Sequence, residues 1–192
     1  MTALGFRVKS GYAIAVVLSG PIRAPSAVAR RVLELSDPDV VETRQPYHAG
    51  MGRAEEDRRE IARRVGIIER CARRSLTALM EDDWYASVGP GERISAGLVV
   101  GSLIDPADVA SPHIRAHANE GRLFRAVLEE ELRSHGITCH VLVEKHLAGR
   151  ATKDLGRSAR EIQRTLADFG RSLGSPWRAE EKAAAIAAWL VL

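Results

Sequence analysis

Several classes of protein are disfavoured by what this 192-residue sequence lacks. Aromatic residues make up only 5% of the chain, too few for the stacked rings with which many proteins hold single-stranded nucleic acids. The longest uninterrupted apolar run, residues 12–18, is far shorter than the roughly 20 residues that a membrane-spanning helix needs. The N-terminus also lacks the basic and apolar regions of a signal peptide. We therefore predict a cytoplasmic protein without membrane contact.

Cysteines and common catalytic motifs are equally scarce. Cys71 and Cys139 form no CxxC pair, and we expect both to be free thiols in a reducing compartment. The chain contains no GxSxG nucleophile elbow, no P-loop and no Rossmann glycine pattern. These absences argue against serine hydrolases of the elbow type, P-loop nucleotide hydrolases and dinucleotide-dependent enzymes.

The charge is weakly positive and is carried almost entirely by arginine. The chain has 28 Lys and Arg residues against 25 Asp and Glu, a net charge of +3, and only 4 of the 28 are lysines. The planar guanidinium group binds phosphate well, but genomic base composition also produces an arginine bias. The charge balance therefore allows a phosphate-bearing partner without identifying one.

Apolar periodicity predicts one domain over residues 1–192, in which strands precede and then alternate with helices. Strands are expected at 5–9, 12–19, 25–36, 94–103 and 137–145, helices at 54–82, 111–135, 158–173 and 177–192, and a long loop at 37–52. Ser111 and Ser158 can cap their helices, and Ser175 with Pro176 repeats the cap-plus-proline signal. The late strand–helix alternation favours parallel pairing after an antiparallel three-strand meander.

Three segments carry a family resemblance. They are VKSGYAIAVVL at 8–18, KHLAGRATKDLGRSAREIQ at 145–163 and EEKAAAIAAWL at 180–190. Together with the element order, they resemble the ribonuclease H-like superfamily, and within it the Holliday-junction resolvases. The resemblance implies an α/β fold with a mixed five-stranded sheet, a three-strand antiparallel meander followed by two parallel strands, flanked by helices.

The catalytic carboxylates of that family are not retained in this sequence. In the family, acids from the first strand, the fourth strand and the last helix hold two metal ions that act on a phosphodiester. The first-strand position here is Lys9 or Ser10, and in the last helix Lys182 follows Glu180 and Glu181. Because cations do not ligate magnesium, we predict a degenerate site. The lysines either pair with the glutamates or bind phosphate directly, which would make the partner nucleic acid or a phosphorylated small molecule.

A second candidate site is independent of the resemblance. His113, His117 and Glu120 occupy positions i, i+4 and i+7 of a predicted helix, within an arc of about 60°. Phe124 continues this arc, so we expect the face to be turned toward the sheet. Two imidazoles one turn apart and a carboxylate can hold a divalent metal, and His48 in the preceding loop is a candidate fourth ligand.

Other roles for this helix start stay open at the level of sequence. Arg44, Arg115 and Arg122 are candidate phosphate contacts, since a helix N-terminus also favours an anion. The histidines could serve an enzyme, with or without a metal, or only form structural hydrogen bonds. A non-catalytic assembly protein is a further alternative, in which the apolar end, residues 187–192, docks a second copy to form a homodimer.

Overall fold

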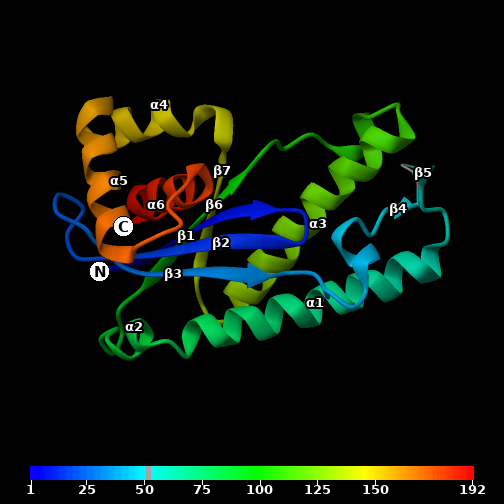
Figure 1. The fold of residues 1–192 in the computed structure, drawn as a ribbon, viewed down its shortest axis with the longest axis horizontal. Coiled ribbons are helices and arrows are strands. Elements are labelled where there is room, and N and C mark those ends of the chain that lie inside the picture. The colour runs from blue at the N-terminus through cyan, green and yellow to red at the C-terminus, as the bar shows by residue number, and fades with distance from the viewer. Residues whose placement is uncertain (51–52) are drawn as a thin grey trace.

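A mixed sheet of five strands forms the centre of the structure (Figure 1). The structure, a computed structural model, describes residues 1–50 and 53–192, so the last two residues of the predicted loop 37–52 lie outside it. The strands are β1 (Thr2–Lys9), β2 (Tyr12–Ser19), β3 (Ser26–Glu34), β6 (Ile94–Val100) and β7 (Thr138–Val143). Their order is β3-β2-β1-β6-β7, antiparallel among the first three and parallel from β1 to β7. The predicted α/β fold class is confirmed.

Helices cover both faces of this sheet (Figure 1). They are α1 (Arg58–Met80), α2 (Asp83–Ala86), α3 (Pro112–Ser134), α4 (Glu144–Leu155), α5 (Ala159–Leu173) and α6 (Ala179–Val191). Short segments complete the chain: the 3-10 helices η1 (Val41–Arg44) and η2 (Pro106–Asp108), and the strand pair β4 (His48–Ala49) and β5 (Arg53–Ala54). Alternate residues of β1, such as Leu4 and Phe6, face the core under α1 and α3, whereas Ile14 and Val16 of β2 face α4, α5 and α6. This alternation follows from the two-residue period of a strand.

The last helix lies directly on the strands because both surfaces are built from very small residues. A Cβ atom at Gly5 would come within 1.8 Å of the carbonyl oxygen of Ala184, and one at Gly97 within 2.6 Å of that of Ala187. The α6 run 183–189 is buried throughout. The apolar end of the chain thus packs within its own core, and a homodimer stays a prediction.

Local capping signals located two of the helices correctly. The Ser111 hydroxyl accepts a hydrogen bond from the Ile114 amide, and that of Ser158 accepts one from the Glu161 amide. The carboxylate of Glu161 in turn accepts from the Ser158 amide, which completes a capping box. Gly136, with a φ of +73°, follows the end of α3.

The start predicted for the last helix is wrong. The residue that caps α6 is Arg178, three positions after Ser175, and its amide donates to Glu181 Oε2 at 2.7 Å. Trp177 lies against Gly170 of α5, where an added Cβ would come within 2.5 Å of its ring. This packing keeps the Ser-Pro pair outside the helix.

Helix α4 is absent from the predicted elements. The strand predicted at 137–145 ends at Val143, and α4 begins at the next residue without a side-chain cap. Only Leu147 and Ala151 of α4 are buried, so the sequence carries neither a start signal nor a strong apolar stripe. No helix within the described ranges combines the length and apolarity that crossing a membrane requires. Cys71 and Cys139 are free thiols, as expected.

Candidate functional site

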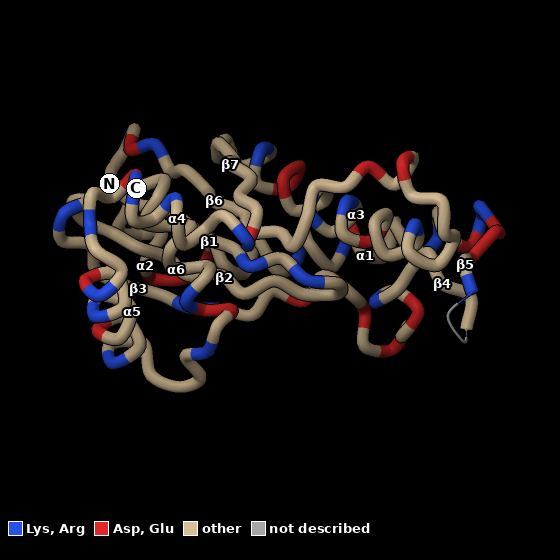
Figure 2. The backbone as a smooth tube through the Cα atoms, turned by 90° about the horizontal axis from the view of Figure 1, so that it is seen from above, with Lys and Arg blue, Asp and Glu red and all other residues tan. Residues whose placement is uncertain are grey.

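Helices α1 and α3 reach beyond the carboxyl ends of β1 and β6, and the loop with η1, β4 and β5 lies beside their outer ends (Figure 1). Basic and acidic residues are scattered along the backbone between uncharged stretches, and neither sign forms a large block (Figure 2). A functional surface therefore has to be identified from individual side chains. In open α/β sheets such side chains gather at the carboxyl edge.

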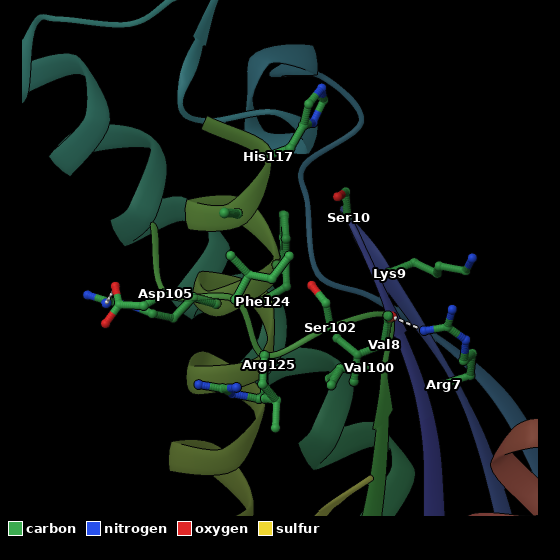
Figure 3. A pocket seen from close by; sticks show the side chains of 16 residues that line it. Arg7, Val8, Lys9, Ser10, Val100, Ser102, Asp105, His117, Phe124 and Arg125 are labelled. Atoms are coloured by element: carbon green, nitrogen blue, oxygen red, sulfur yellow. Dashed lines mark hydrogen bonds and ion pairs between the residues drawn. The ribbon is translucent and has the colours of Figure 1, made fainter. Parts of the chain in front are cut away.

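A cleft of about 490 Å³ opens at this edge, between β1 and β6 on one side and α3 on the other (Figure 3). Its polar lining consists of Arg7, Lys9, Ser10, Ser102, Asp105, His117, Arg122 and Arg125. Four of these residues are cations and one is an acid. That acid, Asp105, has its Oδ1 atom 3.9 Å from Nη1 of Arg122. Arg125 pairs outside the lining, with its Nε 3.5 Å from Glu129 Oε2.

Arg7 is the buried cation of this edge. Its Nε donates to Glu144 Oε1 at 3.2 Å and its Nη2 to Glu144 Oε2 at 2.5 Å, while Nη1 donates to the carbonyl oxygens of Val8 and Val99. Arg7 is 4% exposed and Glu144, the first residue of α4, is 50% exposed. The arginine thus joins the ends of β1 and β6 to the start of α4.

Lys9 forms the ion pair that one of the two sequence-based hypotheses describes. Its Nζ lies 3.4 Å from Glu180 Oε1 on α6, and the hydroxyl of Tyr12 donates to both oxygens of the same carboxylate at 3.1–3.2 Å. Partial burial raises the pKa of Tyr12, and the neighbouring Glu180 charge raises it further. Glu181 is instead used as a cap, and Lys182, half-buried on α6, forms no ion pair within residues 1–50 and 53–192.

The remaining predicted phosphate contacts, Arg44, Arg115 and Arg122, lie in three different places. Arg44 lies beside the β1–β2 turn, with its Cγ within 3.1 Å of a Cβ placed at Gly11. Arg122 lines the cleft. Arg115 is directed elsewhere, because its guanidinium donates to the carbonyl oxygens of Val109 and Ala110 in the segment before α3. Arg115 therefore fixes a loop outside the cleft.

The structure brings the four residues of the predicted histidine site together. His48 Nδ1 lies 2.7 Å from Glu120 Oε1, and His117 Nδ1 lies 3.2 Å from Glu120 Oε2. His48 Nε2 and His113 Nδ1 are 3.3 Å apart. One nitrogen of each of the three imidazoles can be chosen so that all lie within 4.8 Å of one another. This cluster adjoins the cleft, since His117 belongs to both.

A buried arginine holds His48 in this position. Nη1 of Arg64 on α1 donates to the carbonyl oxygens of Pro46 and His48 at 3.1 and 3.0 Å, and its Nη2 donates to Glu55 at 2.9 Å. His48 and Glu120 are 7% and 1% exposed. The loop that carries His48 is thereby tied to α1, although it contains little regular secondary structure.

The expectation that all three helix residues face the sheet is wrong in part. Glu120 and Phe124 are buried, but His113 and His117 are exposed, because the first turns of α3 extend past the sheet edge. The sequence argument also missed Arg7, Arg64 and Glu144. A charged residue inside an apolar strand was the available signal for Arg7, whereas Glu144 lies 137 residues away and had none.

No family model and no curated protein matches this chain. Among solved structures, Thermus thermophilus RuvC is 9% identical, with 99% of this chain and 92% of RuvC covered and a TM-score of 0.53. T. thermophilus RuvC in complex with a Holliday junction substrate is 10% identical, with 99% and 91% covered and a TM-score of 0.52. At these identities the likeness concerns the fold alone, and it shows that the chain has the ribonuclease H-like fold with the organisation of RuvC.

Proposed function

We propose that this protein binds the phosphate backbone of nucleic acid in the cleft at the carboxyl edge, without metal-dependent cleavage. The observation that carries the proposal is the cationic lining, in which Arg7, Lys9, Arg122 and Arg125 outnumber the single acid Asp105. A structure of the same fold, RuvC, has been determined with a Holliday junction substrate, which supports a nucleic acid as the partner.

Two exposed residues are suited to the phosphate contacts themselves. Arg122 is 61% exposed and its Asp105 partner is 3.9 Å away, so a phosphate can reach the guanidinium without burying a charge. Lys9 is 38% exposed, and its exposed pair with Glu180 contributes about 0–1 kcal/mol. A phosphate can therefore replace Glu180 as the partner of Lys9. The hydroxyls of Ser10 and Ser102, at the ends of β1 and β6, are further donors in this cleft (Figure 3).

The same edge does not fit the magnesium ions that a two-metal nuclease of this fold would use. Such ions need several carboxylate oxygens around one point. Here the end of β1 presents Arg7 and Lys9, and the nearest carboxylates, Glu144 and Glu180, are bound to them. The guanidinium and ammonium groups supply fixed positive charge in place of ions. Because these side chains replace the metal ions, we expect the protein to bind the phosphate backbone without cleaving it.

The test is equilibrium binding of a four-way junction and a matched duplex over a range of salt concentrations. We expect affinity to fall at least about tenfold between low and physiological salt, because neutralised phosphates release counterions. The double variant Lys9→Gln/Arg122→Gln should bind more weakly and show a salt slope smaller by about two. The control is Arg164→Gln/Arg171→Gln on α5, which removes the same charge from residues that do not line the cleft. This variant should bind like the wild type.

Three results would overturn the proposal. They are no binding at low salt, binding that is indifferent to salt, and equal losses in the double variant and its control. If nucleoside phosphates raise the melting temperature while neither DNA binds, the cleft belongs to a phosphorylated small molecule and the nucleic-acid assignment is wrong.

A further inference from the structure

We propose that His48, His113 and His117 form a transition-metal site, of the kind that zinc occupies, with Glu120 holding two of the three imidazoles. This site is separate from the magnesium position of two-metal nucleases, since it lies on α3 and the β4 loop and contains no strand carboxylate. It does not depend on phosphate binding in the cleft.

The hydrogen bonds of Glu120 determine which nitrogens are available to a metal. An ionised carboxylate only accepts hydrogen bonds, so the Nδ1 atoms of His48 and His117 carry the protons that they share with it. In the neutral form of both rings the Nε2 atoms are then unprotonated and can act as ligands. A carboxylate behind a ligating histidine fixes the tautomer and raises the basicity of the ring, an arrangement common around zinc.

The spacing of the nitrogens fits a tetrahedral ion. Two nitrogens that each lie about 2.0–2.1 Å from one tetrahedral zinc ion are about 3.3–3.4 Å apart. His48 Nε2 and His113 Nδ1 are 3.3 Å apart. One nitrogen of each of the three rings lies within 4.8 Å of the others, and the side chain of His117, 46% exposed, has room to move closer. The ring centroids of His113 and His117 are already 4.7 Å apart.

Burial divides the cluster into a fixed part and an adjustable part. His48 and Glu120 are almost fully buried, and Arg64 holds the backbone of His48 from the other side. His113 and His117 are exposed on successive turns of α3. A divalent cation bound to the imidazole nitrogens that face away from Glu120 would also offset the negative charge of this carboxylate. Without a positive partner, burial of that charge costs free energy. Such a site is accessible to an ion from solvent without unfolding.

Three imidazole ligands leave one tetrahedral position for solvent or a ligand oxygen, as in zinc sites that keep an exchangeable position. Imidazole ligands suit zinc, copper and nickel, and magnesium prefers oxygen. We therefore expect zinc and cobalt to bind and magnesium not to compete. His117 also lines the end of the cleft at the carboxyl edge, near Ser10 (Figure 3).

The test uses the full chain, freed of metal with a chelator and titrated with zinc or cobalt in the absence of nucleic acid. We expect one ion per chain, a rise in melting temperature with zinc, and the strong visible absorption of four-coordinate cobalt. The His113→Gln and His117→Gln variants should each remain folded and bind zinc about 100-fold or more weakly. This loss should exceed the one caused by replacing a residue that only hydrogen-bonds a ligand. The matched control is His146→Gln on α4, an exposed histidine that should leave binding unchanged.

Glu120 acts as a positioning residue, and its variant separates that role from a purely structural one. Glu120→Gln should weaken zinc binding about 10- to 100-fold and shift the cobalt spectrum, whereas a structural role alone would lower the melting temperature and leave the affinity of the folded protein intact. Wild-type protein that binds neither zinc nor cobalt overturns the proposal. So does binding that survives both His113→Gln and His117→Gln, and the histidines are then hydrogen-bonding residues only.

Discussion

Arg7 and Glu144 form a two-bonded ion pair that joins the end of β1 to the start of α4. Arg7 is almost fully buried, and its Nη1 atom donates to the carbonyl oxygens of Val8 and Val99. The pair therefore holds the ends of β1 and β6 next to the start of α4. The buried guanidinium is thus part of the fold, and the more exposed cations of this edge are Lys9 and Arg122.

Removing the carboxylate of Glu144 should show how much stability is lost when the buried guanidinium of Arg7 has no negative partner. Breaking a fully buried pair costs about 3–5 kcal/mol, but Glu144 is half exposed, and water screens the interaction. We expect Glu144→Gln to lower the free energy of unfolding by about 1–2 kcal/mol in urea titrations. Asp154→Asn, which breaks an exposed pair with Arg150 on the same helix, should cost at most about 0.5 kcal/mol. Equal losses in both variants would contradict this account.

Purified protein should not cut branched DNA or RNA–DNA hybrids with magnesium or manganese. The carboxylates nearest the end of β1 are Glu144 and Glu180, and each is paired with a cation. A cleavage assay with both metals tests this expectation. Robust turnover that Glu180→Ala or Glu181→Ala abolishes would show that these glutamates hold metal ions after all.

A methyl group on the sheet surface beneath α6 should be poorly tolerated. At Gly5 it would lie 1.8 Å from a backbone oxygen of Ala184, so helix and strand would have to separate. Overpacking a core typically costs about 1–3 kcal/mol, and we expect Gly5→Ala to lie at or above the upper end. Gly149→Ala, in α4 with no atom within 4 Å of the added methyl, should instead stabilise by about 0.5–1 kcal/mol. Thermal or urea unfolding of both variants measures the contrast.

The two thiols should react slowly at neutral pH. Burial raises the pKa of Cys139 to about 11, with a further contribution from the charge of Glu129, and burial also raises the pKa of Cys71. Because the thiolate is the nucleophile, alkylation of Cys139 in a Cys71→Ala variant should accelerate with pH up to about 11. The unfolded thiol ionises near 8.5, so stability should fall as the pH rises from there through the folded value. A reaction rate that levels off near pH 8.5 would contradict the shift.

Much of the fold could be predicted from local signals. Alternation and apolar runs located the hairpin, β3, β6 and β7, and serine caps located α3 and α5, because these patterns depend on neighbours only a few residues away. The missing α4 and the displaced start of α6 have the opposite cause. Helix α4 begins without a side-chain cap, and the packing of Trp177 on Gly170 decides where α6 can begin.

The candidate site divides along the same line. The sequence by itself determined that His113, His117 and Glu120 share one side of a helix, since that follows from helical spacing. Only the tertiary structure decided that the buried His48 meets Glu120 across 72 residues, and that Arg7 binds Glu144 across 137. Such contacts depend on how the β4 loop is tied to Arg64 and how α4 follows β7, and neither arrangement has a local signature in the chain.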